Sequence, residues 1–265
     1  METDAARKDR EISEIDLALC RATLYNALAL GFRPPAEETL ARLVSRQGAD
    51  ALADAAAVLD ANPGSELVCA ARSLVRMEAA TVMELSASFQ RLFGHTARGP
   101  VPPYETEYGP EAIFQQPQEL GDLTGFYRAF GLTLNTAEHE RADHVSCECE
   151  FLSFLALKEA YALEQQDAPM LEETCKAARL FLRDHLGRFM PAFAKKLTRE
   201  DQDGFYGALG NLSWRFVFQE CTRLGVPVGP ENLSLRPITH DRVPIACGDG
   251  AECPLMPGSP DAEEA

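Results

Sequence analysis

Apolar residues recur at helical spacing along most of this chain, and no strand-like alternation of useful length occurs. In the segment 142–163, Val145, Cys149, Leu152 and Ala156 follow one another at spacings of four, three and four, so they share one helix face. The same spacing predicts further helices over 12–30, 37–44, 49–59, 65–93, 120–130, 169–190 and 200–224. The pattern therefore predicts an all-α fold, a compact bundle of antiparallel helices joined by short loops.

Glycines and prolines predict where this bundle is interrupted. The segment 94–117 contains three Gly-Pro or Pro-Pro pairs, which favour a long irregular loop. Pro191 is expected to bend the chain into a short helical piece after 169–190. We expect a flexible N-terminus (1–11), one helical domain (12–225, with halves 12–131 and 132–225) and an irregular, proline-rich tail that contains cysteines (226–265).

The composition argues against several classes of protein. The formal charge of -16 and the pI of about 4.7 disfavour nucleic-acid binding, which needs a basic face. No run of about 18 apolar residues is present, and the first residues lack the apolar segment of a secretory signal. We therefore expect a cytoplasmic protein that does not span a membrane.

Ionisable residues gather at the start of the predicted helix 142–163. His144 and Glu148 are four residues apart and share a helix face, and Asp143 stands where a carboxylate can cap the first amides. The structural alternatives are that Asp143 is an ordinary helix cap and His144 a core histidine bonded to a neighbouring carbonyl. Nothing in this arrangement provides an activated nucleophile, so no catalytic residue is expected.

The loop 94–117 contains a second candidate pair, Tyr104 and Glu105. The prolines before them restrict the backbone, so little entropy is lost when the loop orders against the helices. The alternative is that the loop is only a rigid connector between two helical halves.

Together, these two stretches resemble the TorD/DmsD/NarJ family, the chaperones of molybdenum enzymes of the dimethyl sulfoxide reductase family. The resemblance is carried by an LF…GPxPPYExxY loop over 92–108 and an ExxDHxxxE helix start over 140–148. It extends over about 12–225, and its first helix and exit are similar at Arg21, Tyr25, Leu28, Pro34 and Pro35. One departure is Ala142, where the family often has proline.

The resemblance implies an all-helical chaperone that is not an enzyme. Its partner would be the catalytic subunit of an apo-molybdoenzyme, held by a twin-arginine leader or a terminal segment until the cofactor is inserted. No cofactor would be bound permanently, and contact with molybdopterin-guanine dinucleotide would be transient and through the client. The implied peptide-binding residues are Tyr104, Glu105, Asp143, His144 and Glu148. The identity of the client, and whether the chain is a monomer or a dimer, stay open.

Residue chemistry favours the same kind of partner. A twin-arginine leader offers two guanidiniums followed by an apolar stretch, and arginine pairs with carboxylates through two parallel hydrogen bonds. Glu105, Asp143 and Glu148 could supply the carboxylates. Gaps between helices near Phe151 or near Phe126 and Tyr127 could accept the apolar part.

The tail supports an alternative of another class, a metal- or redox-sensing regulator. His240, Cys247 and Cys253 are weak candidates for zinc ligands, because their spacings of seven and six match no standard zinc motif. Free thiols or a disulfide are the simpler interpretation. A helical enzyme is a further alternative, and no chemical constellation in the sequence favours it.

Overall fold

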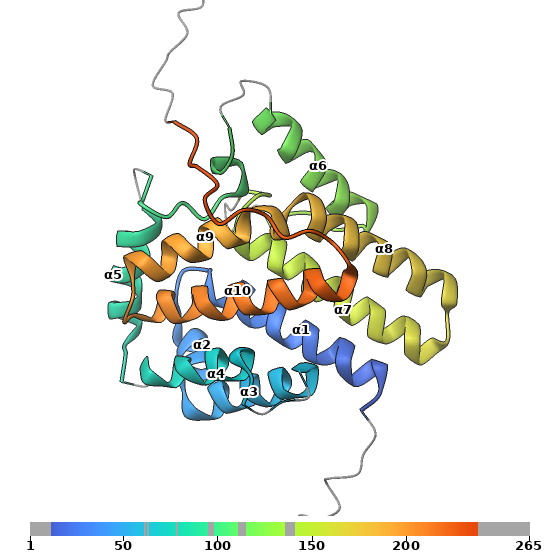
Figure 1. Ribbon diagram of the computed structural model, residues 1–265, viewed down its shortest axis with the longest axis horizontal. Helices are drawn as coiled ribbons and strands as arrows, with labels where there is room; N and C mark the ends of the chain where they lie inside the picture. Colours follow the sequence, from blue (N-terminus) through green and yellow to red (C-terminus); the bar gives the residue numbers. More distant parts are fainter. Residues whose placement is uncertain are drawn as a thin grey trace, which may run out of the picture.

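Helix α1 (Glu14–Gly31) packs along α7 (Val145–Gln165) at the centre of the bundle (Figure 1). The computed structural model describes residues 12–60, 62, 64–77, 79–94, 98–110, 115–135 and 141–237. Two long-range contacts fix the antiparallel register of this pair: the Ser153 hydroxyl donates to the Ala22 carbonyl at 3.0 Å, and Arg21 pairs with Glu159 at 2.8 Å. Within the described residues the regular elements are all helices, so the all-α prediction is confirmed.

The other helices surround this pair. Helices α9 (Leu186–Glu200) and α10 (Phe205–Leu224) pack against each other, as do α3 (Arg46–Asp60) and α4 (Glu66–Ser73). Helix α8 (Ala168–Asp184) follows α7, α5 (Val82–Phe93) lies at one end, and α6 (Gln115–Ala129) lies along the upper edge in Figure 1. Short turns of helix occur at Glu37–Thr39 (α2), Leu40–Val44, Leu74–Met77 and Glu105–Glu107.

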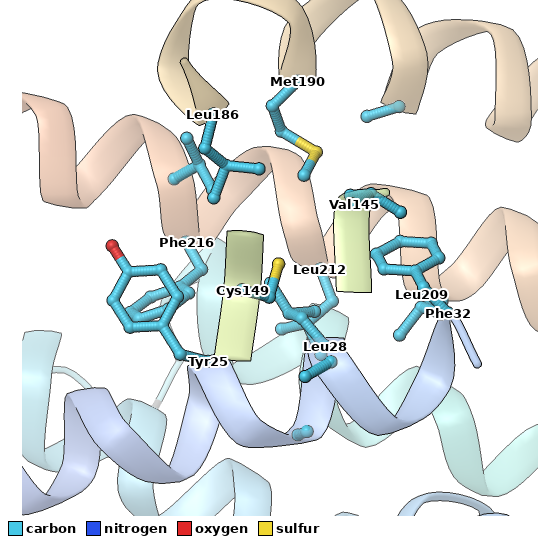
Figure 2. Packing of buried hydrophobic residues seen from close by; sticks show 14 of the residues in the cluster. Tyr25, Leu28, Phe32, Val145, Cys149, Leu186, Met190, Leu209, Leu212 and Phe216 are labelled. Carbon is cyan, nitrogen blue, oxygen red and sulfur yellow. The ribbon is translucent and has the colours of Figure 1, made fainter. Parts of the chain in front are cut away.

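One continuous core joins both halves of the chain. Figure 2 shows its centre, where α1, α7, α9 and α10 all contribute side chains. The labelled residues are Tyr25, Leu28, Phe32, Val145, Cys149, Leu186, Met190, Leu209, Leu212 and Phe216, each exposed by 2% or less. Because every one of these helices has an apolar face, the bundle is the arrangement that buries them together.

Two of the predicted helices are divided in the structure. The segment 65–93 was expected to be one helix, but α4 ends at Ser73 and α5 begins only at Val82. The side chain of Thr81 caps α5 and exchanges hydrogen bonds with Glu84, a capping box that starts a new helix. The segment 169–190 is likewise divided, because α8 ends before His185 and α9 begins after it.

Pro191 does not begin a separate helical piece, as had been expected, but lies inside α9. A proline cannot donate to the carbonyl four residues earlier, which here belongs to Gly187. The Gly229 amide donates to this carbonyl at 3.0 Å instead. A partner from the C-terminal segment therefore replaces the hydrogen bond that the proline removes.

The first part of the predicted tail lies against the helical body. Residues 226–237 are extended, but they pack across α9 toward the long loop (Figure 1). Backbone hydrogen bonds join Gly109 to Ser234 and Arg236 to Glu107 at 2.9 and 2.8 Å. Residues 226–237 therefore pack against the body of the protein without forming a regular element. None of the described helices has the length and hydropathy needed to cross a bilayer.

Candidate functional site

The two stretches singled out in the sequence are in direct contact. The loop at Tyr104 pairs with the turn at His144 as an isolated antiparallel bridge. The Glu105 amide donates to the Asp143 carbonyl at 2.9 Å, and the Val145 amide donates to the Pro103 carbonyl at 2.8 Å. The PPYE loop and the Asp-His turn are therefore one structural unit, although about 40 residues separate them in sequence.

Asp143 is the polar centre of this unit. Its carboxylate is fully buried and accepts hydrogen bonds from the amide and hydroxyl of Thr106 at 3.2 and 2.7 Å. Arg141 donates to both carboxylate oxygens at 3.0 and 2.8 Å, and its guanidinium lies 4.5 Å from the centre of the Tyr104 ring. Asp143 therefore fastens the loop to the turn. It does not cap the helix, although its position in the sequence had suggested that role.

Glu105 is held by a residue of α9 and by His185, which directly precedes α9. The carboxylate is fully buried, with the Arg188 guanidinium at 2.6 Å and Nδ1 of His185 at 3.0 Å. His185 is the residue at which the predicted helix 169–190 divides. A fully buried carboxylate is costly unless it is paired, and these two partners supply that pairing.

His144 is the actual N-cap of α7. Its Nδ1 accepts from the Ser146 amide at 3.1 Å, and its ring lies 5.2 Å from the Tyr104 ring in an edge-to-face arrangement. Burial, and then the nearby charges of Arg141 and Arg33, lowers the pKa of His144 to about 3. A neutral imidazole can accept this hydrogen bond, whereas an imidazolium cannot.

Glu148 is the unusual member of the group. It is fully buried, and neither of its carboxyl oxygens has a hydrogen-bond partner among the described residues. Burial raises the pKa of Glu148 well above its usual range, and the nearby Glu105 and Asp143 carboxylates raise it further. Burial therefore favours the neutral acid over the carboxylate, because ionisation would place an unpaired charge in the interior.

The structure thus brings the five predicted site residues together, but four of them are sealed. Glu105, Asp143, His144 and Glu148 are exposed by 1% or less, and only Tyr104 is partly accessible. The carboxylates of Glu105 and Asp143 are not open to a client arginine in this conformation, because they are already paired with arginines of the chain itself. A role for these residues toward a client stays a prediction.

An accessible cavity lies beside this unit, where the sequence suggested an apolar gap near Phe151 and Tyr127. Its volume is about 410 Å³. The lining combines aromatic side chains with a polar rim and comprises Arg33, Tyr127, Leu132, Thr133, Leu134, Asn135, Ser146, Cys147, Glu150, Phe151 and Phe154. At the rim, Arg33 and Glu150 form an exposed ion pair of 2.6 Å. The cavity is therefore suited to an apolar segment with charged neighbours.

Sequence reasoning missed the residues that complete the buried unit. Arg141 is only two positions before Asp143, so its placement in a turn could have suggested the ion pair. His185 and Arg188 lie 80 and 83 residues after Glu105, and no local pattern indicates their contact with it.

The three candidate metal ligands of the tail lie outside the described residues: His240, Cys247 and Cys253. Over the part of the chain that the structure describes, no group of three or more histidine, cysteine or acidic residues could hold a metal ion.

The sequence of this chain matches a known family model and is similar to proteins that are named as chaperones. Residues 44–195, more than half of the chain, match the family model described as nitrate reductase delta subunit. The chaperone protein TorD of Vibrio cholerae is 27% identical over 203 residues, which are 76% of this chain and 90% of that protein. The perchlorate reductase assembly chaperone protein of Dechloromonas aromatica is 28% identical over 216 residues, 78% of this chain and 90% of that protein. The chlorate reductase assembly chaperone protein of Ideonella dechloratans is 37% identical over 106 residues, 40% of this chain and 53% of that protein.

Proposed function

Because this chain belongs to the family described as the nitrate reductase delta subunit, we propose that it is an assembly chaperone for the catalytic subunit of a molybdoenzyme. One observation carries the proposal: two relatives that are named as chaperones align with this chain over 90% of their own length. The similarity therefore extends over nearly a whole chaperone and is not limited to one motif. The chain acts by binding its client and has no turnover of its own.

The client segment that fits this surface carries positive charge beside an apolar run, as a twin-arginine leader does. The charge of -16 attracts such a segment, and the cavity at Phe151 and Phe154 offers it aromatic walls. Binding takes place in the cytoplasm, before the client is exported. The chain holds no cofactor permanently, and its contact with molybdopterin-guanine dinucleotide passes through the client.

Glu150 is the carboxylate that a client arginine can reach. Its side chain is 57% exposed, and its partner Arg33 is 36% exposed. Such an ion pair contributes little to stability, so an incoming guanidinium can replace Arg33 at a small cost. Glu105 and Asp143 are less suitable in this conformation because their oxygens are buried and occupied.

Calorimetry with a synthetic peptide tests the proposal. The peptide carries two adjacent arginines followed by an apolar run, and a second peptide has lysines in place of the arginines. Phe154→Ala should weaken binding by about ten-fold, as expected for an aromatic anchor in a cavity. The matched control is Leu157→Ala on the same helix, whose side chain is 51% exposed and does not line the cavity.

The controls decide how the result is interpreted. Glu150→Gln should weaken binding of the arginine peptide more than that of the lysine peptide, because lysine cannot form the bidentate pair. If neither peptide binds the wild-type protein or any of the variants, the proposed leader binding is wrong. Equal affinities of the Phe154→Ala and Leu157→Ala variants would move the binding site away from this cavity.

A further inference from the structure

Helix α6 is attached to the rest of the molecule by one apolar face, to which Leu120, Leu123, Phe126 and Tyr127 contribute. Leu123 is fully buried, Tyr127 is 5% exposed, and Phe126 between them is partly buried. The Phe126 ring lies 5.3 Å from the Phe181 ring and 5.5 Å from the His185 ring. Residues at i, i+3 and i+4 thus pack against aromatic side chains of α7 and of the junction between α8 and α9, as the apolar face of a bound amphipathic helix would.

The sequence of α6 gives it little stability of its own. The helix has 15 residues and includes Pro117, Gly121 and Gly125. Both glycines are exposed, and a Cβ atom added at either one would meet nothing within 4 Å, so no packing constraint requires them. Each glycine lowers the helix equilibrium roughly five-fold relative to alanine, and isolated helices of this length are marginal in water. If α6 leaves the body of the protein, it should therefore unwind.

Polar contacts add to this apolar face, beginning with the Gln116 amide group, which donates to the Thr106 carbonyl at 3.1 Å. Glu119 pairs with the Arg236 guanidinium through two contacts of 3.0 Å and with Arg188 at 3.4 Å. The Tyr127 hydroxyl donates to the Ala142 carbonyl at 2.8 Å. The same Arg188 also holds Glu105, so the attachment of α6 and the sealing of the buried carboxylate share one cation.

Beneath α6 lies the buried carboxyl that has no partner. Glu148 is close enough to Tyr127 to add to the effect of burial in raising the pKa of the tyrosine. Both oxygens of Glu148 are buried and unpaired, although a buried polar group normally has a hydrogen-bond partner. A guanidinium that reached this position would supply donors to both oxygens.

We propose that α6 is a displaceable cover, and that a client helix with apolar residues at the spacing of Leu123, Phe126 and Tyr127 takes its place with an arginine directed at Glu148. This inference rests on the proposed chaperone function and extends the client's binding surface from the accessible cavity, at Glu150, to the surface that α6 covers, at Glu148. The closed state presents no unpaired acidic groove to other basic proteins. The client binds when α6 detaches, so the apparent affinity falls with the fraction of protein that is closed.

Three variants test the cover, because they move its equilibrium in opposite directions. Phe126→Ala and Glu119→Gln weaken the closed state and should tighten binding of the arginine peptide by about ten-fold. The double variant Gly121→Ala/Gly125→Ala strengthens α6 and should weaken binding by up to about 30-fold. Asp122→Asn, on the exposed side of α6, is the matched control and should leave the affinity unchanged.

Hydrogen exchange provides a second measurement, which does not depend on the peptide. In the free protein the α6 amides should exchange faster than those of α7, and adding the arginine peptide should reduce their protection further. The proposal that α6 is a displaceable cover would be refuted, even if the peptide binds, by either of two results. One is weaker binding by Phe126→Ala, and the other is protection of the α6 amides as strong as that of the α7 amides. Binding by neither the wild type nor the Phe126→Ala variant would overturn the proposed leader binding instead.

Discussion

Replacing Glu148 with glutamine should stabilise the folded protein by an amount that grows as the pH rises. The carboxyl is fully buried without a partner, and burial raises its pKa well above the ordinary value of 4.5. The unfolded chain therefore releases this proton at a lower pH than the folded chain does. Glutamine has nearly the same shape and does not titrate, so the variant removes this difference alone.

The sign and size follow from proton linkage. A folded pKa above the unfolded one gives a contribution that is fully present below the unfolded pKa and is lost as the pH rises through the folded pKa. Between the unfolded and the folded pKa of Glu148, the wild type loses at most about 1.4 kcal/mol of stability per pH unit at this group. Between about pH 5 and about pH 7, Glu148→Gln should therefore gain up to about 3 kcal/mol over the wild type.

Urea denaturation at these two pH values measures the difference. The fluorescence of Trp214, the only tryptophan, and far-UV circular dichroism should report the same transition. Glu164→Gln is the matched control on α7, because its side chain is exposed and its effect should not change with pH. A Glu148→Gln effect that is equal at both pH values would refute the reasoning, since it would mean that Glu148 is ionised in the folded protein.

Three further substitutions test the buried unit. His144→Asn should keep α7 capped and should remove one pH dependence of stability. The wild type loses up to about 1.4 kcal/mol per pH unit at His144 as the pH falls from 6.5 toward 3, and asparagine does not titrate there; denaturation at two acidic pH values measures the difference. Asp143→Asn should lower the free energy of unfolding by about 1–3 kcal/mol, because Arg141 loses a charged partner, and a thermal melt checks it. Arg236→Ala removes the guanidinium that forms two hydrogen bonds with Glu119 and also contacts the loop carbonyls of Thr106 and Pro110. It should therefore speed proteolysis of the loop 98–110.

The fold class followed from the sequence because helical periodicity is a local property. The division between α4 and α5 also had a local signal, the Thr81-x-x-Glu84 capping box, which the apolar spacing across it concealed. The division at His185 had no such signal. Its ring is held by Glu105, 80 residues away, and a contact of this kind depends on the tertiary structure.

The site could be predicted only in part for the same reason. The sequence identified Glu105 and Asp143 as candidate peptide-binding carboxylates, and the structure places them together. Their burial and pairing depend on Arg188 and Arg141, which decide whether a carboxylate is available to a client. Residue type indicates which charges a site contains, whereas accessibility is set by the elements packed around it.

This distinction changes how loss of binding should be interpreted. Reversing the charge of Asp143 or Glu148 would place a cation in the interior or leave Arg141 unpaired, so reduced binding would accompany reduced stability. Such a result cannot separate recognition from folding. Phe126 is more informative because it is only partly buried and belongs to the proposed cover. Its removal should lower stability while raising affinity, and a residue needed only for folding cannot produce this pair of opposite effects.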